Sequence, residues 1–385
     1  SLATLNAFRA MGVKIEQQGG EVTIFGVGLH GLRAAAAPLD LGNSGTSMRL
    51  LSGLLAGQSF AATLVGDASL SKRPMGRVIQ PLSQMGAIIH SAEAGRPPLQ
   101  ISPVAALQGI DYLLPVASAQ VKSALLLAGL YASSPTSVTE PAPTRDHTER
   151  MLAGFGYPLQ RQGSRVTIQP GGRLTAGKIT VPADISSATF FIVGAAISKG
   201  SHVTLCQVGV NPTRTGVIQI LRQMGADIAI ANEHLVGGEP VADITVRYAP
   251  LHGIDIPEAE VPLAIDEFPA IFIAAAVASG VTRLTGAEEL RVKESDRIAV
   301  MAEGLQRLGV VAEATPDGMI IHGGKGFSGG KVASYGDHRI AMSFAMAALC
   351  ASAAIEISDC ANVATSFPGF TQLATTAGLA ITEVN

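Results

Sequence analysis

Cationic side chains gather in three short segments of this sequence, and their types and spacing fit the binding of anions. The segments SKRPMGR, PTRDHTER and ELRVKESDR supply Arg73, Arg145, Lys293 and Arg297 among their cations. Arginine presents a planar fork of N–H donors that matches carboxylate and phosphate groups. A single exposed arginine needs no functional explanation, but several arginines clustered at turn-like junctions favour a multiply anionic substrate.

Polar turns that precede strongly apolar segments provide a second group of candidates. Five such segments begin at Leu41, Ala117, Ala183, Ala264 and Gly336. Their turns contain Arg49, Ser118, Gln120, Lys122, His338 and Arg339. The first turn of a helix offers unpaired N–H groups and the positive end of the helix dipole. We therefore expect these turns, Lys122 included, to contact phosphate or carboxylate groups.

Carboxylates that could exchange protons stand at two of these places. Asp266 and Glu267 precede an apolar segment, and Glu294 lies between Lys293 and Arg297. Either Asp266 or Glu267 could simply cap a helix, and Glu294 could simply form a local ion pair. The functional alternative is general acid–base catalysis on an anionic substrate held by the neighbouring cations.

The elements that must position these residues recur along the chain. Six amphipathic helices are predicted to end at a glycine, and an alternating strand is predicted to follow each one. The glycines are Gly12, Gly86, Gly156, Gly225, Gly309 and Gly378. A glycine supplies the left-handed residue that commonly ends a helix. Such regular spacing indicates an internal repeat.

Each repeat is predicted to run as strand, buried helix, strand, amphipathic helix and hairpin. The apolar segments must be buried on all sides, so the helices should lie inside and the sheets should face solvent. We predict an α/β protein with six βαβαββ-type repeats in two domains, residues 1–182 and residues 183–385. Parallel helices would bring their N-terminal turns together on one face of each domain, and two such faces would form a cationic cleft.

The first repeat is expected to be incomplete. In the other five repeats the polar turn precedes its glycine by 38 to 43 residues, whereas Gly12 lies too early for one. On this basis we expect the 385 residues to have little or no activity.

Composition excludes several other classes of function. The chain has 385 residues, 47% of them hydrophobic, and 27 Lys and Arg against 30 Asp and Glu give a net charge of −3. This balance disfavours disorder and nucleic-acid binding. No apolar run approaches the roughly 20 residues of a membrane-spanning helix. Three cysteines without metal-ligand spacing predict core thiols in the cytoplasm, and LGNSGT lacks the spacing of a nucleotide-binding loop.

Eight motifs, taken together in this order, resemble one enzyme family. They are LGNSGTSMR, GDASLSKRPMGR, ASAQVKSALLLAGL, TRDHTE, DEFP, ELRVKESDR, DHRIAMSF and ATSFP, between Leu41 and Pro368. The pattern is similar to that of class II bacterial 5-enolpyruvylshikimate-3-phosphate synthases. The resemblance implies the two-domain inside-out α/β barrel of the enolpyruvyl transferases. It also implies transfer of the enolpyruvyl group of phosphoenolpyruvate to the 5-hydroxyl of shikimate 3-phosphate, on the route to chorismate, with no cofactor or metal.

The resemblance also assigns roles to residues, each by its matching motif. The implied phosphoenolpyruvate ligands are Gly45, Arg73, Gln120, Arg297 and Arg339. The implied ligands of shikimate 3-phosphate are Ser118, Ala119, Gln120, Arg145, Asp266 and Lys293, with Arg145 on the phosphate group. Asp266 would accept the 5-hydroxyl proton, Glu294 would exchange a proton with the methylene carbon, and Lys293 would assist. Glycine at position 45 favours sensitivity to glyphosate.

Two alternatives remain at this stage. The related UDP-N-acetylglucosamine enolpyruvyl transferases share the fold and the donor, but they carry a cysteine loop where this chain has Asp67 to Leu70. A noncatalytic remnant of the fold need not retain Asp266, Glu294 and several candidate substrate arginines together. We expect a monomer whose partners are the two small substrates, with neither nucleic acid nor membrane.

Overall fold

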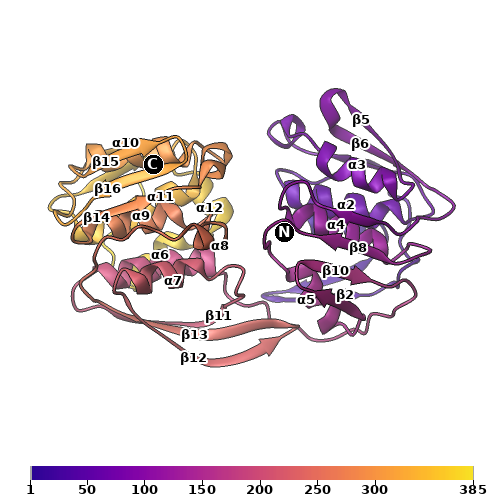
Figure 1. Cartoon of the computed structure of the whole chain (residues 1–385), viewed down its shortest axis with the longest axis horizontal. Helices are drawn as coiled ribbons and strands as arrows, with labels where there is room; N and C mark the ends of the chain where they lie inside the picture. The colour runs from indigo at the N-terminus through magenta and orange to yellow at the C-terminus, as the bar shows by residue number, and fades with distance from the viewer. Residues whose placement is uncertain (1, 385) are drawn as a thin grey trace. The chain divides into compact units, whose positions relative to one another are not determined.

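The computed structural model describes residues 2–384 and divides into two compact units, Ser1–Lys178 and Ile179–Asn385. Each unit is described by itself (Figure 1). The division predicted from the sequence falls after residue 182, within the first residues of the second unit. Each unit contains three sheets.

The first unit contains the elements α1 to β10. They are α1 (Leu2–Ala10), β1 (Lys14–Gln18), β2 (Glu21–Phe25), β3 (Leu39–Asp40), α2 (Gly45–Ala56), β4 (Ala62–Val65), the 3-10 helix η1 (Leu70–Lys72), α3 (Gly76–Gln84), β5 (Ile88–Ala92), η2 (Glu93–Gly95), β6 (Arg96–Ser102), β7 (Asp111–Leu113), α4 (Ala119–Gly129), β8 (Thr136–Thr139), α5 (His147–Gly154), β9 (Leu159–Gln162) and β10 (Arg165–Ile168). Its sheets have the strand orders β1-β2, β3-β4-β6-β5 and β7-β8-β10-β9.

The second unit contains the elements α6 to α13. They are α6 (Ile185–Ile197), β11 (His202–Gly209), α7 (Gly216–Gln223), β12 (Asp227–Val236), β13 (Glu239–Arg247), η3 (Glu258–Glu260), α8 (Val261–Ala264), α9 (Phe268–Val277), β14 (Val281–Leu284), η4 (Glu288–Val292), α10 (Arg297–Arg307), β15 (Val311–Thr315), β16 (Gly318–His322), β17 (Gly330–Ala333), α11 (His338–Ala347), η5 (Ala348–Cys350), β18 (Ile355–Ser358), α12 (Asn362–Ser366) and α13 (Phe370–Thr376). Its sheets have the orders β11-β13-β12, β14-β16-β15 and β17-β18.

The predicted repeat is clearest in the first unit. One copy runs β3, α2, β4, α3, β5 and β6, and the next runs β7, α4, β8, α5, β9 and β10. In both copies the first two strands pair in parallel across the buried helix, and the last two form an antiparallel hairpin. In the second unit the opening strand of two copies is reduced to single parallel bridges, Ala183 with Val208 and Asp255 with Arg283.

The helix-ending glycines adopt the predicted backbone conformation. All six have a positive φ, from 81° at Gly156 to 102° at Gly378. A side chain at these positions would strain the backbone, so glycine ends each helix at low cost. A strand follows five of them, but residues 379–384 form no strand after Gly378, which differs from the prediction.

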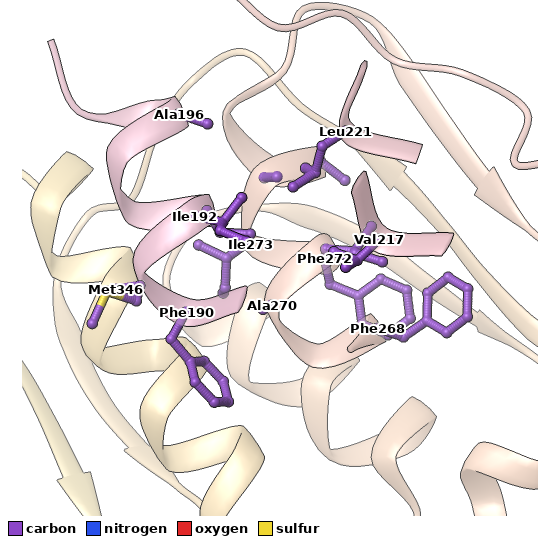
Figure 2. Packing of buried hydrophobic residues seen from close by; sticks show 14 of the residues in the cluster. Phe190, Ile192, Ala196, Val217, Leu221, Phe268, Ala270, Phe272, Ile273 and Met346 are labelled. Carbon is purple, nitrogen blue, oxygen red and sulfur yellow. The ribbon is translucent and has the colours of Figure 1, made fainter. Parts of the chain in front are cut away.

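Apolar helices form the interior of each unit, as predicted. In the second unit all of α9 except Val277 is buried, and twelve of the thirteen residues of α6 are buried. Figure 2 shows Ile192 of α6 beside Ile273 of α9, and all residues labelled there belong to one buried cluster, Met346 of α11 included. In the first unit α2 packs against α4. Strand β6 alternates exposed and buried residues, so one face of its sheet is turned toward solvent.

The cysteines and the apolar helices were the subject of two further sequence predictions. Cys206 and Cys360 are exposed and Cys350 is half-buried, so the prediction of core thiols was wrong. Cys206 lies in β11 where the register to β13 shifts, and Cys360 follows the end of β18. Among residues 2–384, no helix is both long enough and apolar enough to cross a membrane.

Candidate functional site

The candidate residues fall into two sets, one in each unit. The unit-1 site is the set Gly45, Arg73, Ser118, Ala119, Gln120 and Arg145. The unit-2 site is the set Asp266, Lys293, Glu294, Arg297 and Arg339.

The unit-1 site is built where the first turns of α2 and α4 meet. Gln120 accepts a hydrogen bond from Arg49 Nη1 through its Oε1 at 2.8 Å, and its Nε2 donates to Thr46 Oγ1 at 2.8 Å. Arg49 Nη1 also donates to the carbonyl of Gly45 at 3.2 Å. These bonds fix the side chain of Gln120 over the N-terminal turn of α2. The sequence placed Gln120 and Arg49 in polar turns, and the structure joins them.

Arg73 approaches the same turn from the end of η1. Its Nη2 donates to Asn43 Oδ1 at 2.9 Å, and Asn43 in turn donates to Asp67 Oδ2 at 2.9 Å. A Cβ built on Gly45 would lie 2.9 Å from Arg49 Nη1 and 3.4 Å from Arg73 Nη1. Only a residue without a side chain therefore leaves the guanidinium group of Arg49 in place.

The arginines of this site are close enough to affect one another. Burial lowers the pKa of Arg49, and the neighbouring charges of Arg73 and Arg77 lower it further. Positive charge is therefore concentrated beside the N-terminus of α2, where the helix dipole adds to it. An anionic ligand would relieve this repulsion.

The N-terminus of α4 supplies the next candidates. Ser118 is the N-cap, and its Oγ accepts from the backbone N–H of Val121 at 3.3 Å. The hydroxyl keeps its own proton for donation, and the N–H of Ala119 lies in the first helical turn, where the helix offers it no carbonyl. Arg145 is half-buried on the segment between β8 and α5.

Lys122 does not join this anion site, so that prediction was wrong. Its side chain is fully buried and forms ion pairs with Glu140 at 3.0 Å and Glu149 at 2.6 Å. Lys122 lies within α4, past the exposed first turn, and points into the unit.

The unit-2 site centres on the carboxylate of Asp266. Lys293 Nζ lies 3.5 Å and Arg297 Nη1 lies 3.6 Å from the same oxygen, Oδ1. Arg339 Nη1 donates to the backbone carbonyl of Asp266 at 3.0 Å. Of the two carboxylates considered as helix caps, Glu267 occupies the N-cap position of α9, although its side chain makes no capping hydrogen bond. The structure thus brings Asp266, Lys293, Arg297 and Arg339 together.

Arg297 is held by Asp337, a residue that the sequence did not single out. The Nε of Arg297 donates to Asp337 Oδ2 at 2.8 Å, and neither side chain is more than 1% exposed. Burial alone would lower the pKa of Arg297, but Asp337, Glu294 and Asp266 outweigh it and raise that pKa. Among the described residues, Nη1 of Arg297 has no hydrogen-bond acceptor. A buried charged donor without an acceptor favours an anionic ligand.

Glu294 and Lys293 extend from the buried part of the site toward solvent. Glu294 Oε2 accepts from Arg297 Nη2 at 2.7 Å, and the Glu294 side chain is 48% exposed. The local ion pair considered from the sequence is therefore present. Lys293 also pairs with Glu289 at 2.5 Å, four residues earlier in η4.

Glu267, which the sequence offers beside Asp266 as a candidate carboxylate, also lies at this site. It accepts a hydrogen bond from Ser186 Oγ in α6, and its Oε1 lies 3.6 Å from Arg339 Nη1 and 3.9 Å from Arg214 Nη2. Burial raises the pKa of Glu267; Arg339 and Arg214 oppose the shift, and Asp266 adds to it. The N-terminal turns of α6, α9 and α11 therefore meet at one place, as predicted for parallel helices.

The two sites share a chemistry. Both place cations and helix N-termini around positions suited to phosphate or carboxylate, and the unit-2 site adds carboxylates suited to proton transfer. Within residues 2–384, no group of three or more His, Cys, Asp or Glu is placed to hold a metal ion.

Comparison with known proteins gives one consistent result. The family model described as EPSP synthase (3-phosphoshikimate 1-carboxyvinyltransferase) matches residues 1–373. A protein of Alkalilimnicola ehrlichii named 3-phosphoshikimate 1-carboxyvinyltransferase is 69% identical over 384 residues, which cover 100% of this chain and 86% of that protein. One of the same name from Methylococcus capsulatus is 69% identical over 381 residues, covering 99% and 87%. A solved EPSP synthase of Acinetobacter baumannii superposes with a TM-score of 0.94 at 57% identity, covering 100% of this chain and 89% of the other.

Proposed function

We propose a role for each residue of the two sites from the premise that this chain belongs to the EPSP synthase family. The chain is a 3-phosphoshikimate 1-carboxyvinyltransferase with the enolpyruvyl transferase fold. It transfers the enolpyruvyl group of phosphoenolpyruvate to shikimate 3-phosphate and releases phosphate. Both substrates carry several negative charges, so the reaction needs cations before it needs catalysis.

Phosphoenolpyruvate would be bound by the arginines that are already fixed by other side chains. Arg297 and Arg339 in the unit-2 site, and Arg73 in the unit-1 site, would pair with its phosphate and carboxylate groups. Gln120 would donate an amide hydrogen bond, and Gly45 would let the ligand approach the backbone of α2. The unsatisfied Nη1 of Arg297 supports this assignment. Fixed donors cost little to order on binding.

Shikimate 3-phosphate would be bound mainly by the N-terminal turn of α4. Ser118, Ala119 and Gln120 present a hydroxyl, a backbone N–H and an amide there. Arg145 would pair with the phosphate group. Asp266 and Lys293 would contact the hydroxyl that reacts.

The chemistry would proceed by addition and elimination. Asp266 takes the proton of the 5-hydroxyl while that oxygen bonds to C2 of phosphoenolpyruvate, and Glu294 gives a proton to the methylene carbon C3. The resulting tetrahedral intermediate then loses a proton from C3 to Glu294 while the bond between C2 and the phosphate oxygen breaks. The leaving phosphate takes up the proton that Asp266 removed from the 5-hydroxyl, so both carboxyl groups return to their starting states. Lys293, 3.5 Å from Asp266, would stabilise negative charge on the reacting oxygen.

One observation carries this assignment of the general base. A single oxygen of Asp266, Oδ1, lies within 4 Å of both Lys293 Nζ and Arg297 Nη1. An Asp266→Asn variant should lose at least 100-fold in kcat with its melting temperature nearly unchanged. Asp255→Asn, at an exposed ion pair with Arg283, is the matched control and should keep full activity. An Asp266→Asn enzyme with more than a tenth of the normal kcat would refute the assignment.

The remaining sequence predictions concern the activity of the chain, its acceptor substrate, its partners and its location. The comparisons do not support the expectation that the chain is inactive, since the chain covers 86% and 87% of the lengths of two named relatives. Transfer to UDP-N-acetylglucosamine is disfavoured by the names of the family and of those relatives. A monomeric state, a cytoplasmic location, the lack of a nucleic-acid partner and sensitivity to glyphosate stay predictions.

A further inference from the structure

A buried lysine joins the ends of the segment that carries Arg145. Lys122 Nζ lies 3.0 Å from Glu140 Oε1 and 2.6 Å from Glu149 Oε1. The three side chains are 0%, 1% and 7% exposed. Glu140 follows the last residue of β8, and Glu149 lies in the first turn of α5. One ammonium group in α4 therefore pairs with both ends of residues 140–149.

Two hydroxyl contacts reinforce the same connection. Thr148 Oγ1 donates to Ser123 Oγ at 2.7 Å, which ties α5 to α4 a second time. Thr144, the residue before Arg145, donates its hydroxyl proton to Glu140 Oε1. The segment that holds Arg145 is thus fastened at its start, at its middle and at its end.

The cluster uses charges where an ordinary core would use apolar groups. Burying an ion is costly unless a partner of opposite charge is present, so each member depends on the others. Burial raises the pKa of Glu149, and the charge of Lys122 opposes that shift. Removing one member of the cluster would therefore leave the others buried without their partner charge.

We propose that Lys122, Glu140 and Glu149 form a positioning cluster, which holds Arg145 at a fixed place relative to Ser118 and Ala119 for the phosphate of shikimate 3-phosphate. The cluster is buried and touches no ligand; it acts through Arg145. This inference rests on the proposed function, which assigns Arg145 and Ser118 to that substrate. Gln120 is held separately by Arg49 and Thr46, so phosphoenolpyruvate binding should be largely independent of the cluster.

The first test is Lys122→Met, which keeps the length of the side chain and removes its charge. The KM for shikimate 3-phosphate should rise at least ten-fold, while the KM for phosphoenolpyruvate changes less than three-fold. Lys14→Met, at an exposed ion pair with Glu16 in the same unit, is the matched control and should change neither KM. An equal rise of both KM values in a folded Lys122→Met enzyme would refute the proposal.

A second variant addresses the chance that Lys122→Met does not fold. The triple variant Lys122→Met, Glu140→Gln and Glu149→Gln leaves no buried charge unpaired, and such replacements often preserve stability. It should melt near the normal temperature and still show the ten-fold rise in the KM for shikimate 3-phosphate. A folded triple variant with a normal KM for that substrate would overturn the proposal.

Arg145→Gln separates failure of this inference from failure of the proposed function. If Arg145→Gln leaves the KM for shikimate 3-phosphate unchanged, the assignment of Arg145 is wrong and the cluster has no target. If Arg145→Gln raises it and the triple variant does not, only the positioning role is wrong. Both Arg145→Gln and the triple variant are expected to raise the KM for shikimate 3-phosphate. Adding the triple substitution to Arg145→Gln should then raise this KM less than two-fold further, since the effects of coupled residues are not additive.

Discussion

The guanidinium of Arg297 and the carboxylate of Asp337 form an ion pair in which Nε lies 2.8 Å from Oδ2 and both side chains are excluded from solvent. Asp337 also caps α11 through the backbone N–H of Arg339, at 2.9 Å from Oδ1. One carboxylate therefore holds the guanidinium of Arg297 and the backbone from which Arg339 extends.

Asp337→Asn should weaken the binding of phosphoenolpyruvate more than it slows any other step of the reaction. The amide keeps a capping oxygen but removes the charge opposite a buried arginine, and a hydrogen bond to a charged group is worth about 1.5 to 3 kcal/mol. The KM for phosphoenolpyruvate should rise about ten-fold or more in steady-state assays. An unchanged KM would show that Arg297 does not need Asp337.

The same substitution should have a characteristic pH dependence. Burial alone would raise the pKa of Asp337, but Arg297 holds it below its usual range. A lowered pKa stabilises the folded chain above the unfolded value of about 3.9, and that stability is lost as the pH falls through the folded value. The melting temperature of the unmodified chain should exceed that of Asp337→Asn at pH 6, and the gap should narrow below about pH 4. A difference in melting temperature that did not change with pH would contradict a charged Asp337 paired with Arg297.

Gly45→Ala should displace the guanidinium group of Arg49. The new methyl group would lie 2.9 Å from Arg49 Nη1, which must move, and 3.4 Å from Arg73 Nη1, which it would touch. We expect the KM for phosphoenolpyruvate to rise several-fold, while the KM for shikimate 3-phosphate changes little. Gly76→Ala, also at the first residue of a helix but with open space around its Cβ, is the control. Equal effects of the two substitutions would rule out this steric account.

Glu267→Gln should reveal a carboxyl group that retains its proton unusually well. Burial raises the pKa of Glu267. A raised pKa contributes stability that is complete below the unfolded value of about 4.3 and is lost as the pH rises through the folded value. As the pH rises from 4 to neutral, the melting temperature of the unmodified chain should therefore fall relative to that of Glu267→Gln. The exposed Glu303→Gln serves as the control, and a pH-independent difference at position 267 would disprove the shift.

Periodic features of the fold were predictable from the sequence, because they depend on local rules. Gly12 and Gly378 lie far apart in the chain, but each follows an amphipathic helix and each has a positive φ. The apolar helices had to be buried, and their polar first turns then had to meet. This reasoning was enough to place Arg339 beside Asp266, 73 residues apart.

Partners of buried charges were not predictable in the same way. The polar turn of α4 predicts Lys122 as a cation of the anion site, but its side chain is buried and paired with Glu140 and Glu149. Glu267 pairs with Ser186, 81 residues away, and no spacing in the sequence indicates that contact. Such pairs depend on how distant helices pack, which the local pattern does not encode.

The release of phosphate from phosphoenolpyruvate tests the central claim most directly. The 385-residue chain should be incubated with phosphoenolpyruvate and shikimate 3-phosphate, singly and together, while free phosphate and the enolpyruvyl ether are measured. The account predicts that phosphate and the ether form in equal amounts only when both substrates are present, and that Asp266→Asn abolishes both. It would be contradicted if the folded chain formed no ether with both substrates, or formed one only when UDP-N-acetylglucosamine replaced shikimate 3-phosphate.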